Sequence, residues 1–286
     1  MTIIDMRLRP PLPSWVGHLQ FRRGEDYYSK LGYQMPRSVK TQSILDLLSE
    51  MDDAGVELGV IMGRQSEDPL GVVPNDEIAA CIAAHPTRFV GWLGLDLQRS
   101  MDWCLAEIGR CLQKPGFKGV SIEPTISKDS TIESPNDRRL YPIYEECVKR
   151  SVPINITLSA QLQARLRRPY EHSSPLGLYR LAQTFPKLVI HVAHAAWPYV
   201  MDMIGVAFVC PNIWLSPDQY MVSRLPGASE YVKAIAHYFG DRAVFGTAYP
   251  SRPHGQMVDE YRQLGFDSEI LHQVFTQNAR RLMKLD

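Results

Sequence analysis

The chain lacks the features that mark several large classes of protein. It has no apolar run of about 18 residues, which a membrane-spanning helix would need, and no basic stretch followed by an apolar leader at its start. Basic and acidic residues are equal in number, at 31 each, so no net field favours nucleic acid or a membrane surface. These absences predict a cytoplasmic protein with no nucleic-acid and no membrane partner.

Cysteine is scarce and several catalytic signatures are missing. The five cysteines form no CxxC pair, and their odd number and scattered spacing are typical of reduced thiols rather than a disulfide framework. The chain contains no HExxH motif, no P-loop and no GxSxG motif. Function must therefore be inferred from the fold and from the residues that the fold brings together.

What the chain does contain is a regular alternation of apolar and amphipathic stretches. The apolar stretches predict eight strands, at residues 3–10, 56–63, 88–95, 117–124, 152–157, 187–194, 212–216 and 242–248. Near-continuous apolar strands, most of them followed by a predicted helix, favour a parallel sheet that is buried on both faces. Eight such units close most simply into a (β/α)8 TIM barrel, and we predict one α/β domain over residues 1–286. An open doubly wound sheet is the alternative, but no glycine-rich turn follows the first strand.

The first predicted strand carries an unusual concentration of charge. Alternation along the strand predicts one apolar face and one charged face, formed respectively by Ile4, Met6 and Leu8 and by Asp5, Arg7 and Arg9. We expect the charged face to line the barrel, so that two guanidinium groups point into its mouth. The segment 11–39 that follows is long, rich in proline and aromatic, which suits a lid or binding loop; a packed surface excursion is the alternative.

Active sites of such barrels lie at the C-terminal ends of the strands. The polar residues that we expect there are Asp5, Arg7, Arg9, Arg64, Asp96, Glu123, Asn155, Thr157, His191, His194, Ser216, Asp218, Thr247 and Tyr249. His191 is expected on the opposite face of its strand, against helices. Arg64 and Asp218 are expected to be rim residues only.

In this order and spacing, several segments resemble the amidohydrolase-related family of the amidohydrolase superfamily. They include IIDMRLRP, NDEIAACIAAHPTRFVGWLGLD, GFKGVSIEP, FPKLVIHVAHAAWP and YFGDRAVFGTAYP, and they span nearly the whole chain. This branch includes decarboxylases of the aminocarboxymuconate-semialdehyde type and pyrone-dicarboxylate lactonases. The resemblance implies a barrel enzyme for small carboxylates, and by analogy a homo-oligomer.

The resemblance also implies where a metal would be bound. Its five ligand positions align with Arg7, Arg9, Thr157, His194 and Ala248, so only the histidine is retained. A guanidinium has no lone pair to offer a metal and stays protonated at any working pH. We therefore predict no family-type metal site and no cofactor.

Other roles are expected for the polar residues of the mouth. We predict that His194, Glu123 and Asp5 are catalytic, with His194 as a neutral base whose pKa is lowered by neighbouring cations. Alternatively, His194 is only a hydrogen-bonded barrel histidine, and Glu123 is the counter-ion of the arginines.

The arginines are expected to bind an anionic substrate group, or else to be neutralised internally by Asp5, Glu123 or Asp218. The complete predicted substrate-binding set is Arg7, Arg9, Asn155, Thr157 and Tyr249.

Three functions remain open from the sequence. The first is a metal-independent enzyme that acts on a small carboxylate, either a lactonase-like hydrolase or a carboxy-lyase. The second is an inactive, carboxylate-binding barrel. The third is a zinc hydrolase whose displaced ligands would be His194 with Asp5, Glu123 or Asp218. The polar character of the mouth favours an enzyme.

Overall fold

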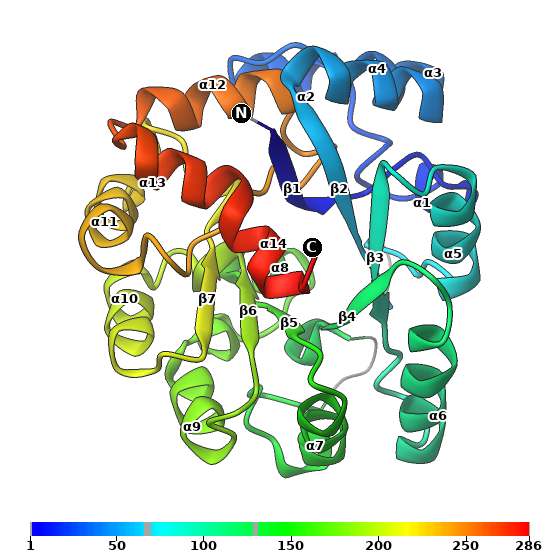
Figure 1. Ribbon diagram of the computed structural model, residues 1–286, viewed down its shortest axis with the longest axis vertical. Coiled ribbons are helices and arrows are strands. Elements are labelled where there is room, and N and C mark those ends of the chain that lie inside the picture. The colour runs from blue at the N-terminus through cyan, green and yellow to red at the C-terminus, as the bar shows by residue number, and fades with distance from the viewer. Residues whose placement is uncertain (1, 66–69, 128–130, 286) are drawn as a thin grey trace.

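Seven parallel strands form one continuous sheet in the computed structural model, which describes residues 2–65, 70–127 and 131–285. The strands are β1 (Ile3–Leu8), β2 (Val56–Met62), β3 (Phe89–Gly94), β4 (Phe117–Ile122), β5 (Ile154–Thr157), β6 (Ile190–Ala193) and β7 (Ile213–Ser216). They lie in sequence order, and each pairs in parallel with the next. Helices surround the sheet in a ring (Figure 1). The α/β barrel predicted from the sequence is confirmed.

The eighth predicted strand, 242–248, is not a regular strand. It forms a single parallel bridge between Leu215 and Ala243, and the Val244 amide donates to the Leu215 carbonyl at 2.9 Å. On its other side, the Met6 amide donates to the Phe245 carbonyl at 3.0 Å. The segment therefore closes the ring between β7 and β1 with few ladder bonds. Beyond Ala248, whose backbone lies in the left-handed region with φ 53°, the Tyr249 carbonyl accepts from the Arg9 amide at 3.1 Å.

Helices lie between the strands, as the sequence predicts, and further short helices lie within the segment 11–39 and directly after β5. They are α1 (Pro13–Val16), α2 (Glu25–Lys30), α3 (Arg37–Thr41), α4 (Ile44–Ala54), α5 (Asn75–Ala84), α6 (Met101–Leu112), α7 (Tyr141–Arg150), α8 (Ala160–Arg165), α9 (Leu176–Thr184), α10 (Val200–Val209), α11 (Ala228–Ala234), α12 (His254–Gln263), α13 (Ser268–His272) and α14 (Asn278–Met283). In α4 the Ser43 hydroxyl caps the first turn, and Gly55, at φ 72°, ends the helix. Within the described chain no helix is both long and apolar enough to cross a bilayer.

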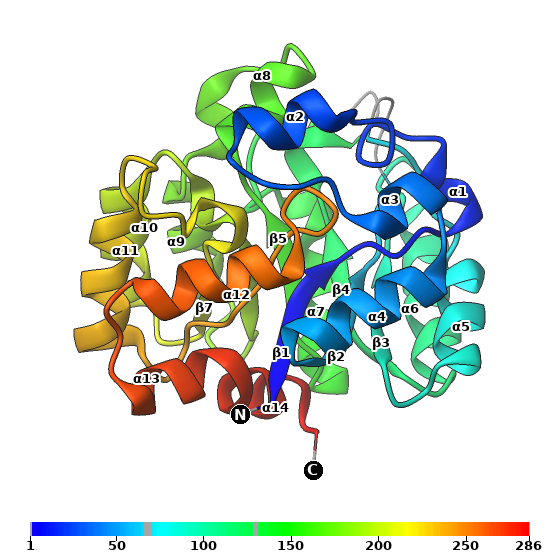
Figure 2. The same ribbon diagram turned by 90° about the horizontal axis from the view of Figure 1, so that it is seen from above.

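The two ends of the barrel differ in what covers them. Figure 2 shows both termini and α14 at one end, and α2 and α8 over the opposite end. At the α14 end, Leu282 and Met283 pack with Met6 and Trp92 in an apolar cluster inside the barrel. The opposite end is where the strands finish, so it holds the polar residues.

The pleat of β1 is irregular, and this changes which way its side chains point. Its pairing with β2 shifts register between Ile3 and Ile4 and again between Asp5 and Leu8. Met6 faces the barrel interior, whereas Leu8 packs against the outer helices in the main core cluster. The prediction that Ile4, Met6 and Leu8 share one face is therefore wrong for Leu8. A bulge places one extra residue in a strand and reverses the alternation beyond it.

The close packing of β2 against β3 can be tested by substitution of one glycine. At the end of β2, a Cβ on Gly63 would lie 2.2 Å from the Gly94 backbone nitrogen, and backbone cannot move aside as a flexible side chain can. We expect Gly63→Ala to lower the free energy of unfolding by about 1–3 kcal/mol in urea denaturation. Gly255→Ala is the matched control, because nothing lies within 4 Å of its added Cβ, and it should be neutral or stabilising. Equal effects of the two changes would contradict the close approach.

Candidate functional site

A pocket of about 550 Å³ lies at the end of the barrel that α2 and α8 cover. An unusual number of cationic groups line it, namely Arg9, Arg23, Arg64, Arg165 and Arg252. His194 lies among them. Among the described residues that line it, none is aspartate or glutamate. A cavity of this size suits a small ligand, and its charge suits an anionic one.

Arg64 and Glu123 form the strongest ion pair at the base of the pocket. Arg64 Nε donates to Glu123 Oε2 at 2.9 Å and Nη2 donates to Oε1 at 2.7 Å, both within the protein interior. Burial by itself raises the pKa of Glu123, but the charges and hydrogen bonds of Arg64, followed by the charge of Arg7, lower it to about 2. Glu123 is therefore an ionised counter-ion, as the alternative from the sequence proposed, and Arg64 is not a rim residue.

Arg7 lies beneath the pocket rather than on its wall. Its side chain is 1 % exposed, and Nη1 donates to Thr157 Oγ1 at 3.3 Å. Nη2 lies 3.8 Å from Glu123 Oε1 and Nε lies 3.7 Å from Asp218 Oδ2. Burial lowers the pKa of Arg7, while Asp218 and Glu123 oppose that change. Two carboxylates thus neutralise this guanidinium internally.

Arg9 has a different environment from Arg7. It lines the pocket, only 3 % of its surface is exposed, and its Nε has no hydrogen-bond partner in the described part of the chain. Burial lowers its pKa well below the usual value, with Arg64 and then Arg7 acting in the same direction. A guanidinium nevertheless stays protonated in proteins, so Arg9 is a buried charge that faces a cavity. The charges of Glu123 and Asp218 only partly oppose the fall in its pKa, and no described carboxylate forms an ion pair with it.

His194 and Asp218 form a buried hydrogen-bonded pair at the ends of β6 and β7. His194 Nδ1 lies 2.7 Å from Asp218 Oδ1, and the His194 amide donates to Oδ2 at 3.2 Å. A carboxylate only accepts, so Nδ1 carries the proton and Nε2 is left with its lone pair. Burial lowers the pKa of His194 to about 4; Asp218 opposes the change and Arg7 adds to it. The predicted neutral histidine agrees with this direction, although burial is the main cause.

The backbone at this pair is held in a sparsely populated conformation. His194, Ala195, Ala196 and Asp218 have φ values of 66°, 42°, 57° and 43°. Non-glycine residues in the left-handed region cost free energy, and they persist where the surrounding structure fixes them, often at functional sites. Asp218 is thus a buried partner of His194 and not the rim residue that was predicted.

A neutral polar layer lies below the charged one inside the barrel. Asn155 donates to Ser121 Oγ at 3.0 Å and to Thr157 Oγ1 at 3.2 Å, and its Oδ1 lies 2.9 Å from His191 Nδ1. His191 also packs edge-on against Trp92 of β3, across the barrel. The expectation that His191 faces the helices is therefore wrong. Asn155 and Thr157 support Arg7 from below and do not line the pocket.

Asp5 and Tyr249 face away from the pocket. Asp5 accepts from the Thr247 amide at 3.0 Å and from its hydroxyl at 2.5 Å, which ties β1 to the segment that closes the barrel. His254 Nε2 lies 3.1 Å from Asp5 Oδ2, and the His254 ring stacks on Tyr249. The Tyr249 hydroxyl donates to Glu50 of α4 at 2.7 Å. The structure does not bring these two predicted site residues together with Arg9 and His194.

The sequence reasoning missed most of the outer wall of the pocket. Arg23 precedes α2, Arg165 ends α8 and Arg252 precedes α12. Arg23 lies in the segment 11–39 that was predicted to be a lid or binding loop, and this was its only signal. Arg165 and Arg252 stand in segments without a strand end or a motif, so no pattern in the sequence singles them out.

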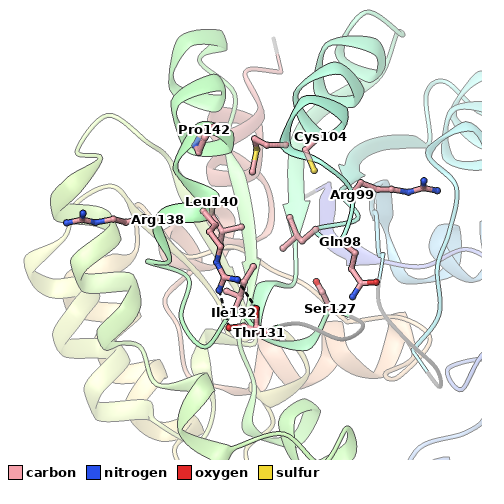
Figure 3. Close-up of a pocket in the computed structure, with 12 residues that line it drawn as sticks. Gln98, Arg99, Cys104, Ser127, Thr131, Ile132, Arg138, Leu140 and Pro142 are labelled. Carbon is pink, nitrogen blue, oxygen red and sulfur yellow. Dashed lines mark hydrogen bonds between the residues drawn. The ribbon is translucent and has the colours of Figure 1, made fainter.

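A second pocket, of about 760 Å³, is lined by the loops that follow β3 and β4. Its side chains are less suited to binding an anion or to catalysis. Its arginines are Arg99, Arg138 and Arg139, and Figure 3 shows Arg99 and Arg138 extending away from each other. Arg139 is paired with Asp137 and donates to Thr131 Oγ1 at 2.7 Å. Burial raises the pKa of Cys104 in this pocket to about 11, so the thiol is not activated. We therefore place the candidate site in the arginine-lined pocket.

The side chains at this site do not fit a divalent metal ion. No group of three or more His, Cys, Asp and Glu side chains within residues 2–65, 70–127 and 131–285 is arranged to hold one. Arg7 donates to Thr157 and lies between Glu123 and Asp218, so a cationic group already stands among the carboxylates that a metal would need. A metal ion placed there would be repelled by the guanidinium.

Comparison with known proteins identifies the family. The amidohydrolase family profile matches residues 4–285, so the chain belongs to the amidohydrolase family. It is 25 % identical over 242 residues to a 2-amino-3-carboxymuconate-6-semialdehyde decarboxylase of Dictyostelium discoideum. The matched region covers 74 % of this chain and 66 % of the decarboxylase, so this chain spans just under two thirds of that relative's length.

Solved structures agree on the fold. An uncharacterised TIM-barrel protein from Bordetella bronchiseptica is 30 % identical, with a TM-score of 0.89 over 99 % of both chains. A 2,6-dihydroxybenzoate decarboxylase from Rhizobium is 19 % identical, with a TM-score of 0.71 over 100 % of this chain and 99 % of that one.

The buried ion pair at the base of the pocket makes a testable contribution to stability. We expect Arg64→Met to lower the free energy of unfolding by about 3 kcal/mol, because Glu123 is then a buried carboxylate without its bidentate partner. Adding Glu123→Gln should recover part of the loss. Arg99→Met, which removes an exposed partner of Asp96, should cost about 1 kcal/mol or less. Urea denaturation at neutral pH measures all three, and an equal cost for the two arginines would contradict the assignment.

Proposed function

We propose that this member of the amidohydrolase family is a metal-independent hydrolase, lactonase-like, that acts on a small carboxylate bound in the arginine-lined pocket. The observation that carries the proposal is that one cavity contains both a neutral His194 and a buried Arg9 whose Nε has no hydrogen-bond partner among the described residues. A carboxylate ligand would supply the counter-ion that Arg9 lacks, through a charge-assisted hydrogen bond. His194 would then stand beside the bound molecule with a free nitrogen lone pair.

The geometry of His194 supports a general-base role. Asp218 accepts the Nδ1 proton and fixes the ring, so Nε2 is the nitrogen that can take a proton from water. The water oxygen forms a bond to the substrate carbonyl carbon as that proton moves to Nε2. The bond from the carbonyl carbon to the ring oxygen then breaks, and that oxygen takes the proton back from the imidazolium. The lactone is thereby opened and the histidine is neutral again.

The fixed arginines would stabilise the negative charge that develops in this reaction. A preformed cation in a site that excludes water stabilises an oxyanion without reorganising solvent. Arg9 faces the pocket and is the group for this role or for the substrate carboxylate. Arg7, beneath it, orients Asp218 and Glu123.

A carboxy-lyase is the second candidate, favoured by relatives whose names are those of decarboxylases. In that reaction the bond to the carboxylate carbon breaks, its electron pair stays on the substrate, and a proton must be delivered to it. The pKa of His194, at about 4, makes the protonated imidazole scarce at neutral pH, which places this reaction second. An inactive carboxylate-binding barrel would retain Arg9-dependent binding without turnover.

Replacement of the proposed base should lower activity, whereas treatment with a metal chelator should not. Against a panel of small lactones and aryl carboxylates that carry a carboxylate, we expect His194→Gln to lower kcat/KM about 10²- to 10⁴-fold. His237→Gln, an exposed histidine far from the pocket lining, is the matched control and should leave kcat/KM unchanged. Treatment with a chelator should also leave it unchanged. Loss of activity with chelator and recovery with zinc or manganese, with stoichiometric metal in elemental analysis, would instead support a hydrolase with displaced ligands.

The pH dependence tests the assignment of the base separately. Because the pKa of His194 is about 4 in the folded protein instead of its ordinary 6.5, the base form is present in mild acid. We expect kcat/KM to be flat from roughly pH 5 to pH 8 and to fall below, as the free enzyme is protonated. Asp218 raises that pKa, so Asp218→Asn should move the inflection to still lower pH. An inflection near 6.5 that Asp218→Asn does not move would contradict the assignment.

A further inference from the structure

The arginines of the pocket form two separate clusters. The inner cluster is Arg9 with Arg64, at the ends of β1 and β2 beside His194. The outer cluster is Arg23, Arg165 and Arg252, which come from three segments remote in the chain. One anionic group at the inner cluster would be enough for the proposed reaction, so the outer cluster requires its own explanation.

The outer cluster is organised around neutral groups. Arg23 Nη1 donates to Ser251 Oγ at 2.6 Å and to the Tyr27 hydroxyl at 2.8 Å, and its guanidinium lies over the Tyr27 ring at 4.1 Å. Arg252 Nη1 donates to the same hydroxyl at 3.1 Å. These bonds draw two guanidinium groups to one oxygen atom and orient them without neutralising either.

No described carboxylate pairs with the outer arginines. Arg252 is 7 % exposed, and its Nε has no hydrogen-bond partner in the described ranges. Burial lowers the pKa of Arg23, Tyr27 opposes the change, and Arg165 and Arg252 lower it further. Like charges gathered in a partly dehydrated wall repel one another, and this cost persists unless an anion is bound there.

The inner cluster has the same deficit independently. Arg9 is buried, its Nε has no partner among the described residues, and the carboxylate of Glu123 is already engaged by Nε and Nη2 of Arg64. The pocket therefore presents two positions whose positive charge no described carboxylate pairs with, one beside the proposed base and one at the outer wall.

We propose that the ligand of this pocket is a dianion whose two anionic groups are held by different clusters. The inner group is bound by Arg9 beside His194, and the outer group is bound by Arg23 and Arg252, with Arg165 at the exposed edge. Each anionic group is a carboxylate or a phosphate-type group, since both match the planar fork of a guanidinium. This inference rests on the proposed function for the inner group, and it adds the outer group and three specificity-determining arginines.

Binding of matched anions tests the proposal. Dicarboxylates from malonate to adipate are titrated calorimetrically at constant ionic strength, each against the monocarboxylate of equal carbon number, and phosphonoacetate is compared with malonate. We expect the best dicarboxylate to bind at least about tenfold more tightly than its monocarboxylate, as a second charge-assisted contact provides. Whether phosphonoacetate or malonate binds more tightly then distinguishes a phosphate-type group from a carboxylate.

Variants assign the second group to the outer wall. The dicarboxylate advantage is the ratio of dicarboxylate to monocarboxylate affinity. Arg23→Met should remove most of this advantage and Arg165→Met part of it. Both variants should leave monocarboxylate affinity unchanged. Arg165 is exposed, so its replacement tests binding without a risk to folding, and thermal melting checks the Arg23 variant. Arg22→Met is the matched control, because Arg22 is the exposed neighbour of Arg23 and does not line the pocket. It should change neither affinity.

The outcomes separate this inference from the proposed function. Equal affinities of the wild-type protein for matched mono- and dicarboxylates would overturn the dianion, and so would a dicarboxylate advantage that survives Arg23→Met and Arg165→Met. Arg9→Met should weaken the binding of both ligand types. If it weakens neither, carboxylate binding at the inner position, and with it the proposed function, is contradicted.

Discussion

The site depends on a row of buried charges of alternating sign across the mouth of the barrel. Arg64 pairs with Glu123, Glu123 lies near Arg7, Arg7 lies near Asp218, and Asp218 binds His194. Each charge is out of water, so each is tolerable only because the next one compensates it. The alternation fixes the orientation of every member, and it leaves His194 neutral with one nitrogen directed away from its acid. Arg9 lines the pocket outside this row of charges, and it is the cation that we propose binds the ligand.

In the proposed function, a guanidinium would take the place that a metal ion has as electrophile. A metal ion would polarise a carbonyl and lower the pKa of bound water, whereas a guanidinium supplies charge and directional donors but no coordination site. An enzyme that relies on arginine must therefore generate its nucleophile with a separate base. Burial lowers the pKa of His194 and keeps the imidazole unprotonated well into the acid range, which the proposed general-base role requires.

The pocket also shows how little a net charge says about a site. The chain has 31 basic and 31 acidic residues, and yet five arginines and no described carboxylate line one cavity. The field that a small anion meets is set by the local distribution and is focused by low-dielectric walls. A neutral protein can thus bind anions selectively while having no general attraction for nucleic acid.

The sequence by itself determined the barrel and the approach of Arg9 to its mouth, because periodicity and strand ends are local properties of the chain. The pKa of His194 is low mainly because of burial, so its neutral state depends on the tertiary structure. Only the tertiary structure decided the rest. Register shifts in β1 turned Leu8 outward and let Arg7 enter the interior, and spacing alone does not reveal a bulge. The pairing of Arg64 with Glu123, 59 positions apart, and the meeting of three remote arginines depend on how the loops fold over the mouth. No pattern within a single segment contains that information.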